Sequence, residues 1–271
     1  MSLGKTNKYL GGFLIAFFLT AAFLGWVWTP FDPLAVDLRS KLQAPGAVHP
    51  LGTDEYGRDV LSRLLAAART SVTISILTVS FAVFFGIILG SVSGYARGWV
   101  DRVVMLFTDT LLAFPSILLA LALLSILGAN MYGVVLALGF AYMPTVTRVV
   151  RGAVMSLREQ EFIEASRLMG HPVLYTLRCH IVPNCLAPVI VIATSMFGSV
   201  LLTESALSFL GLGVPPPAPT WGNMLASARP YMGQAAWLGI FPGLCISMTL
   251  LGINLLGDYI RDRFDPRMRG L

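Results

Sequence analysis

One polar segment interrupts this sequence: SLREQEFIEASRLMGHPVLYTLRCHIVPNCLAP, residues 156–188. It carries six charged side chains, whereas the whole sequence is 56% hydrophobic and only 12% charged. An ordinary soluble domain has roughly 25% charged residues, and a chain this apolar would aggregate in water. The sequence therefore predicts an integral membrane protein in which this segment, called here the polar loop, lies outside the lipid.

Apolar runs long enough to cross a membrane flank the polar loop on both sides. The first has no charged residue from Tyr9 to Trp28, and about twenty helical residues cover roughly 30 Å, one hydrocarbon thickness. A cleaved signal peptide usually has an apolar core of about 7–15 residues, so a retained helix is favoured over that alternative. The predicted spans are residues 9–28, 70–95, 103–127, 131–150, 186–207 and 235–256. We therefore expect an all-α membrane bundle with six transmembrane helices.

The chain divides into an N-terminal part, residues 1–69, and a core bundle, residues 70–271, that contains the polar loop. Four prolines between residues 30 and 50 break helical continuity and predict an irregular segment outside the lipid. The segment leads to Gly52, after which Thr53 or Asp54 suits a helix N-cap. Apolar residues at helical spacing from Val60 then predict an amphipathic helix that lies along the membrane interface.

Lys and Arg residues are distributed unevenly over this arrangement. The loops that follow the first and fifth spans carry six of the nineteen: Arg39, Lys41, Arg58, Arg63, Arg69 and Arg229. The other thirteen lie on the side of the two termini and the polar loop. Because basic residues stay preferentially on the cytoplasmic side, we expect both termini and the polar loop to be cytoplasmic. This bias also accounts for the net charge of +5 without a nucleic-acid partner.

The polar loop has the signals of two short helices joined by a turn. Ser156 and Glu159 fit a capping box, which predicts a helix start. An apolar stripe of Phe162, Ala165 and Met169 follows at helical spacing. Gly170 suits a left-handed helix end, and a second helix from residue 172 to about residue 182 is expected to stop at Pro183. Helices this short need a surface to pack on, so the stripe should contact a partner protein or the end of the bundle.

Three glycines spaced by four lie in the second predicted span: Gly86, Gly90 and Gly94. Small residues on one stripe let membrane helices approach closely. This spacing favours a tight helix contact over a pore lining.

Two carboxylates lie within predicted spans, Asp109 and Glu204. A charge in hydrocarbon costs at least about 2.5–3.5 kcal/mol, so each should face the bundle interior or water. A position on a translocation path and a hydrogen bond that fixes helix packing both remain open for Glu204. For Asp109, about two turns from the cytoplasmic side, the packing interpretation is favoured.

No catalytic or metal site is predicted in the sequence. The topology places Asp109 and Glu204 near opposite faces of the membrane, which argues against an intramembrane enzyme that uses both. His171, Cys179, His180 and Cys185 match no recognised zinc spacing, and no metal site is expected. A passive channel is a further alternative, but nothing resembles a selectivity filter.

Several motifs together resemble the membrane subunits of bacterial binding-protein-dependent ABC importers, and more narrowly the C-type permease of the peptide and nickel uptake branch. Glu164-Ala165-Ser166, with Gly170 and Pro183, is similar to the Glu-Ala-Ala signature of their cytoplasmic loop, with Ser166 in place of the second alanine. The likeness covers roughly residues 31–269. Its further motifs are Gly52-Thr53-Asp54, Gly57-Arg58-Asp59, the run 204–213, Trp221-Gly222, the run 254–258, Arg261-Asp262 and Asp265-Pro266-Arg267.

The resemblance implies a type I ABC importer fold in the bacterial inner membrane. It implies a second homologous permease, two cytoplasmic ATPase subunits and an external solute-binding protein as partners. The ATPase-coupling residues would be Glu164, Ala165, Ser166, Gly170, Pro183 and Asn184. The chain has no phosphate-binding Gly-rich loop followed by Lys-Ser or Lys-Thr, so ATP and Mg²⁺ are expected on the partner subunits and no cofactor in this chain. Di- or oligopeptides are the expected substrate, with nickel or a metal chelate as the alternative.

Overall fold

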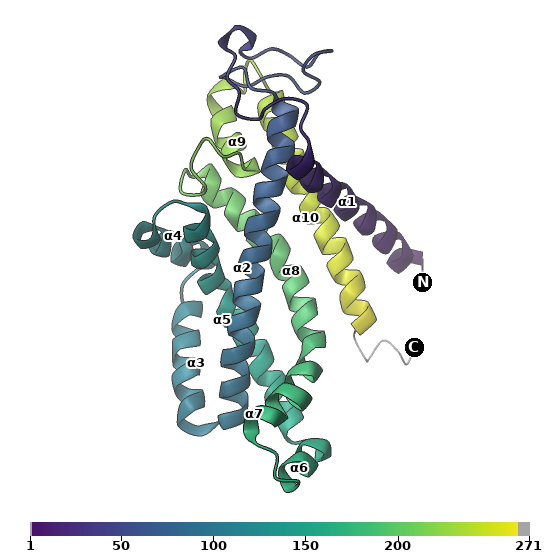
Figure 1. The fold of residues 1–271 in the computed structure, drawn as a ribbon, viewed down its shortest axis with the longest axis vertical. Coiled ribbons are helices and arrows are strands. Elements are labelled where there is room, and N and C mark those ends of the chain that lie inside the picture. Colours follow the sequence, from purple (N-terminus) through teal and green to yellow (C-terminus); the bar gives the residue numbers. More distant parts are fainter. Residues whose placement is uncertain (1, 265–271) are drawn as a thin grey trace.

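The protein is a bundle of long helices in the computed structural model, which describes residues 2–264, with side chains from residue 8 to residue 261 (Figure 1). Within that range the only extended pairing is an isolated bridge between Thr53 and Asp59, so the all-α prediction is confirmed. The long helices are α1 (Ser2–Val27), α2 (Val60–Ala96), α3 (Gly98–Leu112), α4 (Ser116–Leu127), α5 (Met131–Arg158), α8 (Val182–Phe209) and α10 (Trp237–Phe264). The short ones are η1 (Leu38–Ser40), α6 (Glu161–Leu168), α7 (Val173–Thr176), η2 (Leu177–Ile181), α9 (Trp221–Ala228) and η3 (Arg229–Tyr231).

Five helical runs in the described chain are long and apolar enough to cross a membrane. Helices α3 and α4 pass the same test only when taken together, and they are bent by 96° at the break between them. Six crossings result when this pair is counted as one span. The third span predicted over residues 103–127 is therefore not one continuous helix, because it consists of α3 and α4 with a break between them. Pro115 stands at the N-cap of α4 and has no amide proton with which to continue the hydrogen bonds of α3, so the helix breaks there.

The second crossing is one continuous helix of 37 residues, α2. The separate interfacial helix predicted before residue 70 is instead the first part of α2. Its N-cap is Asp59, whose carboxylate accepts a hydrogen bond from the Ser62 amide at 2.8 Å, so the prediction of Thr53 or Asp54 is wrong.

The long loop between α1 and α2, residues 28–59, is held together by buried charges. Asp54 accepts from Arg58 Nε at 2.7 Å and pairs with Arg63 Nε at 3.3 Å, and all three side chains are buried. Trp237 Nε1 donates to the Thr53 carbonyl at 3.3 Å and so joins this loop to the start of α10. The acids of this segment therefore have structural partners.

Helices α2 and α5 approach each other closely along the predicted glycine stripe. A Cβ added to Gly86 would stand 2.6 Å from Val146 Cβ, and one added to Gly94 would stand 2.9 Å from Val154 Cβ. No side chain fits at such distances without a shift of the neighbouring helix. The prediction of a tight helix contact is confirmed.

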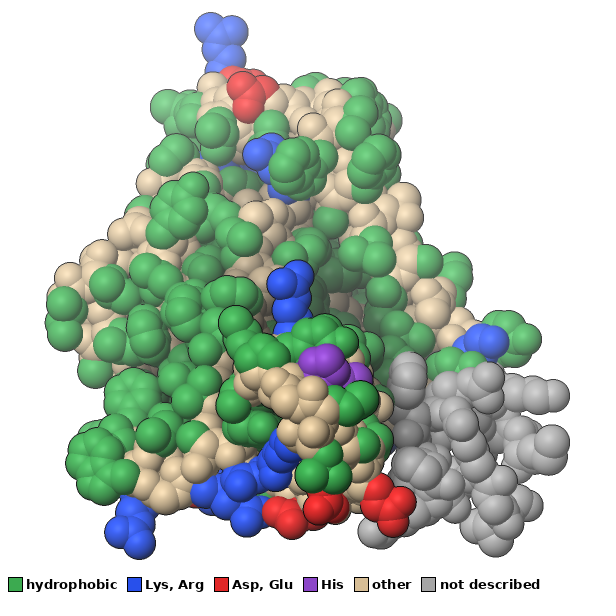
Figure 2. Space-filling model, turned by 60° about the horizontal axis from the view of Figure 1, so that its bottom comes forward, with side chains coloured by type: hydrophobic (Ala, Val, Ile, Leu, Met, Phe, Trp, Pro, Cys, Tyr) green, Lys and Arg blue, Asp and Glu red, His purple; other side chains and the backbone are tan. Residues whose placement is uncertain are grey.

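Hydrophobic side chains cover most of the face shown in Figure 2, and Lys, Arg, Asp and Glu side chains gather mainly along its lower edge. Exposed apolar residues of the long helices include Phe13 of α1, Phe84 of α2, Leu106 of α3 and Ile240 of α10. Figure 1 shows the long loop at the top and α6 at the bottom, with the start of α1 and the end of α10 between them, directed away from the long loop. The motif Asp265-Pro266-Arg267 lies outside the described residues.

Candidate functional site

The polar loop begins later than its capping box predicts. Helix α5 continues through Ser156 to Arg158, and α6 starts at Glu161 with Gln160 as its N-cap residue. Glu159 lies at the corner between the two helices and accepts from Arg97 NH2 at 2.5 Å. The predicted helix start at Ser156 is wrong because Val154 is fully buried against the bundle, which favours continuation of α5 past this point.

Gly170 ends the first half of the loop as predicted. Its φ of +77° lies in the left-handed region, which residues with a Cβ rarely adopt. A Cβ at this position would meet no atom within 4 Å. Glycine is therefore favoured here by the backbone conformation and not by lack of space.

The second half of the loop does not stop at Pro183. Helix α7, the wide turn η2 and α8 form one helical run over Val173–Phe209, and Pro183 lies in the first turn of α8. Proline is accommodated there because the wide turn η2 already departs from the regular hydrogen-bond pattern: the Val182 amide donates to the Leu177 carbonyl, five residues back. Asn184 Nδ2 donates to the His180 carbonyl at 2.6 Å across this junction. The loop thus returns to the membrane as a continuous helix, and the predicted break at Pro183 is wrong.

Two residues of α6 hold it against the rest of the chain. Ile163 and Ser166 are buried, and Ser166 Oγ lies 3.1 Å from Thr176 Oγ1 of α7. The isoleucine was not singled out in the sequence, although its spacing of three from Ser166 places both on one face of the helix.

The opposite side of α6 is apolar and exposed. Leu168 is 83% exposed, Met169 68% and Phe162 44%, and the neighbouring Ala165 and Glu164 are exposed as well. Leu174 of α7 extends this surface with 74% exposure. We call Phe162, Ala165, Leu168, Met169 and Leu174 the α6 face. The predicted stripe of Phe162, Ala165 and Met169 therefore points away from the bundle, as a docking surface would.

Glu204 of α8 is fully buried in the bundle. Its carboxylate accepts from Ser208 Oγ at 2.8 Å and lies 3.4 Å from Ser71 Oγ of α2. Among the described residues no Lys or Arg forms an ion pair with it. The hydrogen bond to α2 suits a packing role for this side chain.

Asp109 of α3 has a different environment. Its carboxylate accepts from Arg148 NH2 of α5 at 2.6 Å, and both side chains are about half exposed. The two intramembrane carboxylates share no hydrogen-bond partner, and the structure does not bring them together as a catalytic pair would require.

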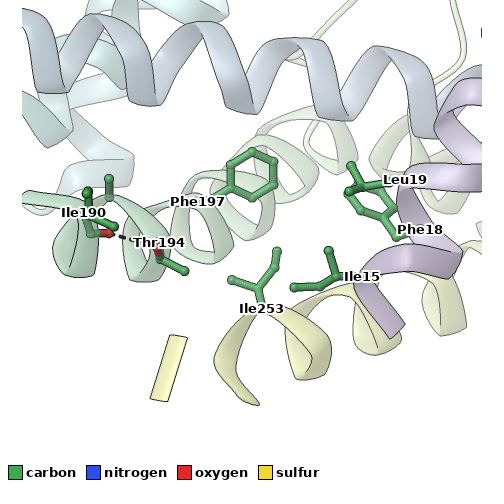
Figure 3. Close-up of a pocket in the computed structure, with 8 residues that line it drawn as sticks. Ile15, Phe18, Leu19, Ile190, Thr194, Phe197 and Ile253 are labelled. Carbon is green, nitrogen blue, oxygen red and sulfur yellow. Dashed lines mark hydrogen bonds between the residues drawn. The ribbon is translucent and has the colours of Figure 1, made fainter. Parts of the chain in front are cut away.

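A groove lies between α1, α8 and α10 and has a volume of about 390 Å³. Figure 3 shows its lining side chains, which are Ile15, Phe18, Leu19, Ile190, Ala193, Thr194, Phe197 and Ile253. Thr194 is the one hydroxyl in this set, and its Oγ1 already donates to the Ile190 carbonyl at 2.8 Å. The groove therefore offers no free polar group that would orient a peptide.

Metal-ligating side chains are dispersed in the described part of the chain. Among these residues, no group of three or more His, Cys, Asp or Glu side chains lies close enough together to hold an ion. Cys179, Cys185 and Cys245 are free thiols, on different helical segments and with different exposure.

The chain is similar to known transport proteins over most of its length. The dipeptide transport system permease protein of Alkalihalophilus pseudofirmus is 40% identical, over 98% of this chain and 88% of that protein. The di/tripeptide transport system permease protein of Pseudomonas aeruginosa is 41% identical, over 99% of this chain and 91% of that protein.

The fold is similar to that of a solved membrane transporter. A chain of the MetNI methionine ABC transporter in an inward-facing conformation superposes with a TM-score of 0.60 at 19% identity, over 75% of this chain and 96% of that chain. The type I importer fold implied by the sequence is thereby confirmed. The family model described as "binding-protein-dependent transport system inner membrane component" matches residues 82–270. This chain therefore belongs to the family of inner membrane components of binding-protein-dependent transport systems.

Proposed function

We propose that the chain forms half of the translocation pathway of a peptide importer and that the α6 face receives a cytoplasmic ATPase subunit. The observation that carries the proposal is the exposed apolar side of α6, at the end of the bundle where α5 and α8 converge. In water this surface is unfavourable, and contact with a protein groove would remove it from solvent. Glu164, Ala165 and Ser166 form the centre of the helix that docks, Gly170 closes it, and Pro183 with Asn184 sets its return to the membrane.

The energy source lies on the partner subunits in this proposal. The chain has no Gly-rich phosphate loop, so ATP and Mg²⁺ bind to the two ATPases. A second homologous permease completes the pathway, and an external solute-binding protein delivers the substrate. Closure of the ATPases would move α6 and shift the bundle between outward-open and inward-open states, because contacts that differ between two states change their populations.

Di- and oligopeptides are the proposed substrates. The two relatives described above are named for dipeptide and di/tripeptide transport, and each matches nearly the whole chain. Nickel is not favoured as an alternative, since neither relative is named for it. Asp109 and Glu204 remain predictions for the translocation path, and the burial of Glu204 makes it a candidate only in another conformation of the bundle.

The proposed orientation places both termini and α6 in the cytoplasm. The start of α1 and the end of α10 lie on the side away from the long loop, as the polar loop does (Figure 1), and thirteen of the nineteen Lys and Arg residues belong to this side in the predicted topology. Basic residues favour the cytoplasmic side. The segment up to residue 69 would then present the long loop to the outside, and residues 70–271 would form the core of the permease.

A charge introduced on the α6 face tests the docking proposal. Leu168→Asp should reduce copurification of the ATPase subunits with the tagged permease and lower peptide uptake in proteoliposomes. Leu38→Asp is the matched control, because Leu38 is 68% exposed but lies in the long loop at the other end of the molecule. Full ATPase retention and normal uptake in Leu168→Asp would show that the ATPase does not dock here.

A further inference from the structure

Tyr95 lies in the last turn of α2, between two arginines from the neighbourhood of the polar loop. The guanidinium carbon of Arg158, the last residue of α5, is 5.5 Å from the centre of its ring. The guanidinium carbon of Arg167 of α6 is 5.2 Å from the same centre. Both distances are within the range of about 6 Å in which a cation is attracted to an aromatic face.

Hydrogen bonds add direction to both contacts. Arg158 NH1 donates to the Tyr95 backbone carbonyl at 2.6 Å, and this carbonyl is one of the last four of α2, which have no partner within their own helix. Arg167 Nε donates to the Tyr95 hydroxyl at 3.3 Å. One residue therefore contacts the end of α5 through its backbone carbonyl and ring, and α6 through its ring and hydroxyl.

The contact between Arg167 and Tyr95 is distinctive among the polar contacts of α6. In the part of the chain with described side chains, the other side-chain hydrogen bond of α6 joins Ser166 to Thr176, and this contact stays within the polar loop. Arg167 thus provides the side-chain hydrogen bond from α6 to a helix that crosses the membrane.

Helix α2 continues from this contact to the other end of the molecule. At 1.5 Å per residue its 37 residues extend about 55 Å. Near its start, the Leu64 carbonyl accepts from Trp221 Nε1 of α9 at 3.2 Å. A displacement applied at Tyr95 would therefore reach the loops on the far side through one continuous helix.

We propose that Tyr95 is a positioning residue that transmits the movement of α6 to α2. This inference rests on the proposed function, because it requires that an ATPase moves α6. The hydroxyl and the ring act separately: the hydroxyl fixes the direction of Arg167, and the ring holds both guanidinium groups at the end of α2.

The test separates docking from transmission in the full complex of permease and ATPase subunits. Tyr95→Phe removes the hydroxyl and keeps the ring, whereas Tyr95→Leu removes both. The quantity to measure is peptide imported per ATP hydrolysed in proteoliposomes, together with copurification of the ATPases and the melting temperature of the permease. We expect this ratio to fall about threefold in Tyr95→Phe, as the loss of one hydrogen bond predicts, and further in Tyr95→Leu, which also loses both ring contacts. ATPase binding should be retained in both variants.

Two comparisons make the result specific. Tyr132→Leu is the matched control, since Tyr132 is 73% exposed at the start of α5 and makes no ring contact with a cation among the described side chains. Arg167→Gln combined with Tyr95→Phe should be no worse than the poorer single variant, because both remove the same hydrogen bond. If Tyr95 had only a structural role, its substitution would lower the melting temperature and leave the ratio of peptide imported to ATP hydrolysed unchanged.

Two outcomes distinguish the inference from the function on which it rests. An unchanged ratio in both Tyr95 variants, in a complex whose wild type couples normally, would overturn the role of Tyr95 and leave the proposed function intact. If the wild-type permease neither retained ATPases nor imported peptide, the proposed function itself would be contradicted.

Discussion

Gly90 of α2 lies directly against Val150 of α5: a Cβ added to the glycine would stand 2.7 Å from the valine Cβ. The same approach is repeated one turn earlier and one turn later along α2, so the two helices are in close contact over two turns. Helix α2 reaches from the long loop to the polar loop, and this contact fixes its position against α5.

Gly90→Val should therefore destabilise the bundle. Insertion of a side chain into a well-packed contact costs about 1–3 kcal/mol, and here the neighbour includes backbone that cannot rotate away. We expect a lower melting temperature in detergent and a lower yield of folded permease. Gly152→Val is the matched control, because a Cβ at Gly152 on α5 meets no atom within 4 Å. Equal melting temperatures for the two variants would contradict the contact.

Gly170→Val should reduce transport more strongly than Gly170→Asn. The φ of +77° is costly for a β-branched residue, whereas Asn adopts left-handed conformations more readily. Since there is space for either side chain, the difference isolates the backbone conformation. ATP-dependent peptide uptake in proteoliposomes measures it, with ATP hydrolysis recorded in parallel. If Gly170→Val imported peptide at the wild-type rate, the turn at Gly170 would have no part in coupling.

Two substitutions of Glu204 distinguish a packing role from a position on the translocation path. Gln keeps an oxygen that accepts from Ser208, so Glu204→Gln should preserve stability, whereas Glu204→Leu leaves buried hydroxyls without an acceptor at a cost of about 1–3 kcal/mol. If Glu204 acts only in packing, uptake follows the melting temperature in both variants. A Gln variant that is stable but fails to transport would instead assign the carboxylate to the translocation path.

The three free cysteines allow the proposed orientation to be measured. Cys179 is exposed in the polar loop, whereas Cys185 is buried. A membrane-impermeant maleimide should label Cys179 in inside-out vesicles and not in intact cells, and bound ATPase should slow the reaction. The variant Cys185→Ser with Cys245→Ser confines the label to Cys179. Labelling from outside the cell would reverse the orientation.

The turn η1 in the long loop should loosen at low pH. Hydrogen bonds from Ser40 Oγ, at 2.7 Å, and from the Arg39 amide hold the pKa of Asp37 below its usual value of 3.8. A carboxyl with a lowered pKa contributes stability above its unfolded pKa and loses it as the pH falls through the folded value. The protection of amides over residues 38–42 against hydrogen exchange, corrected for the intrinsic rate at each pH and followed by mass spectrometry, should therefore fall below a pH of 3.8. Asp37→Asn should weaken this pH dependence.

Helices and close contacts that depend on local sequence could be predicted. The spacing of Gly86, Gly90 and Gly94 indicated a tight contact, and Gly170 indicated a left-handed turn, because each is a property of backbone sterics. The apolar stripe of the polar loop was also visible in the sequence, although its exposed and buried sides were not.

Features that depend on distant packing could not be predicted. The capping box at Ser156 is a local signal, and the burial of Val154 on α5 overrides it. Pro183 predicts a helix stop, yet it follows directly after the wide turn η2, where the regular hydrogen-bond pattern is already interrupted. The contact between Arg167 and Tyr95 joins residues 72 positions apart, and no single-sequence pattern connects them.

The break between α3 and α4 has a consequence for the assembled transporter. Ala113, Phe114 and Pro115 are exposed in the isolated chain, and the bend leaves backbone carbonyls there outside a regular helix. Hydrocarbon cannot solvate such groups, so non-helical backbone at membrane depth persists only beside protein or water. With the break at membrane depth, the face that carries it is expected to turn away from lipid in the working complex, toward protein or water.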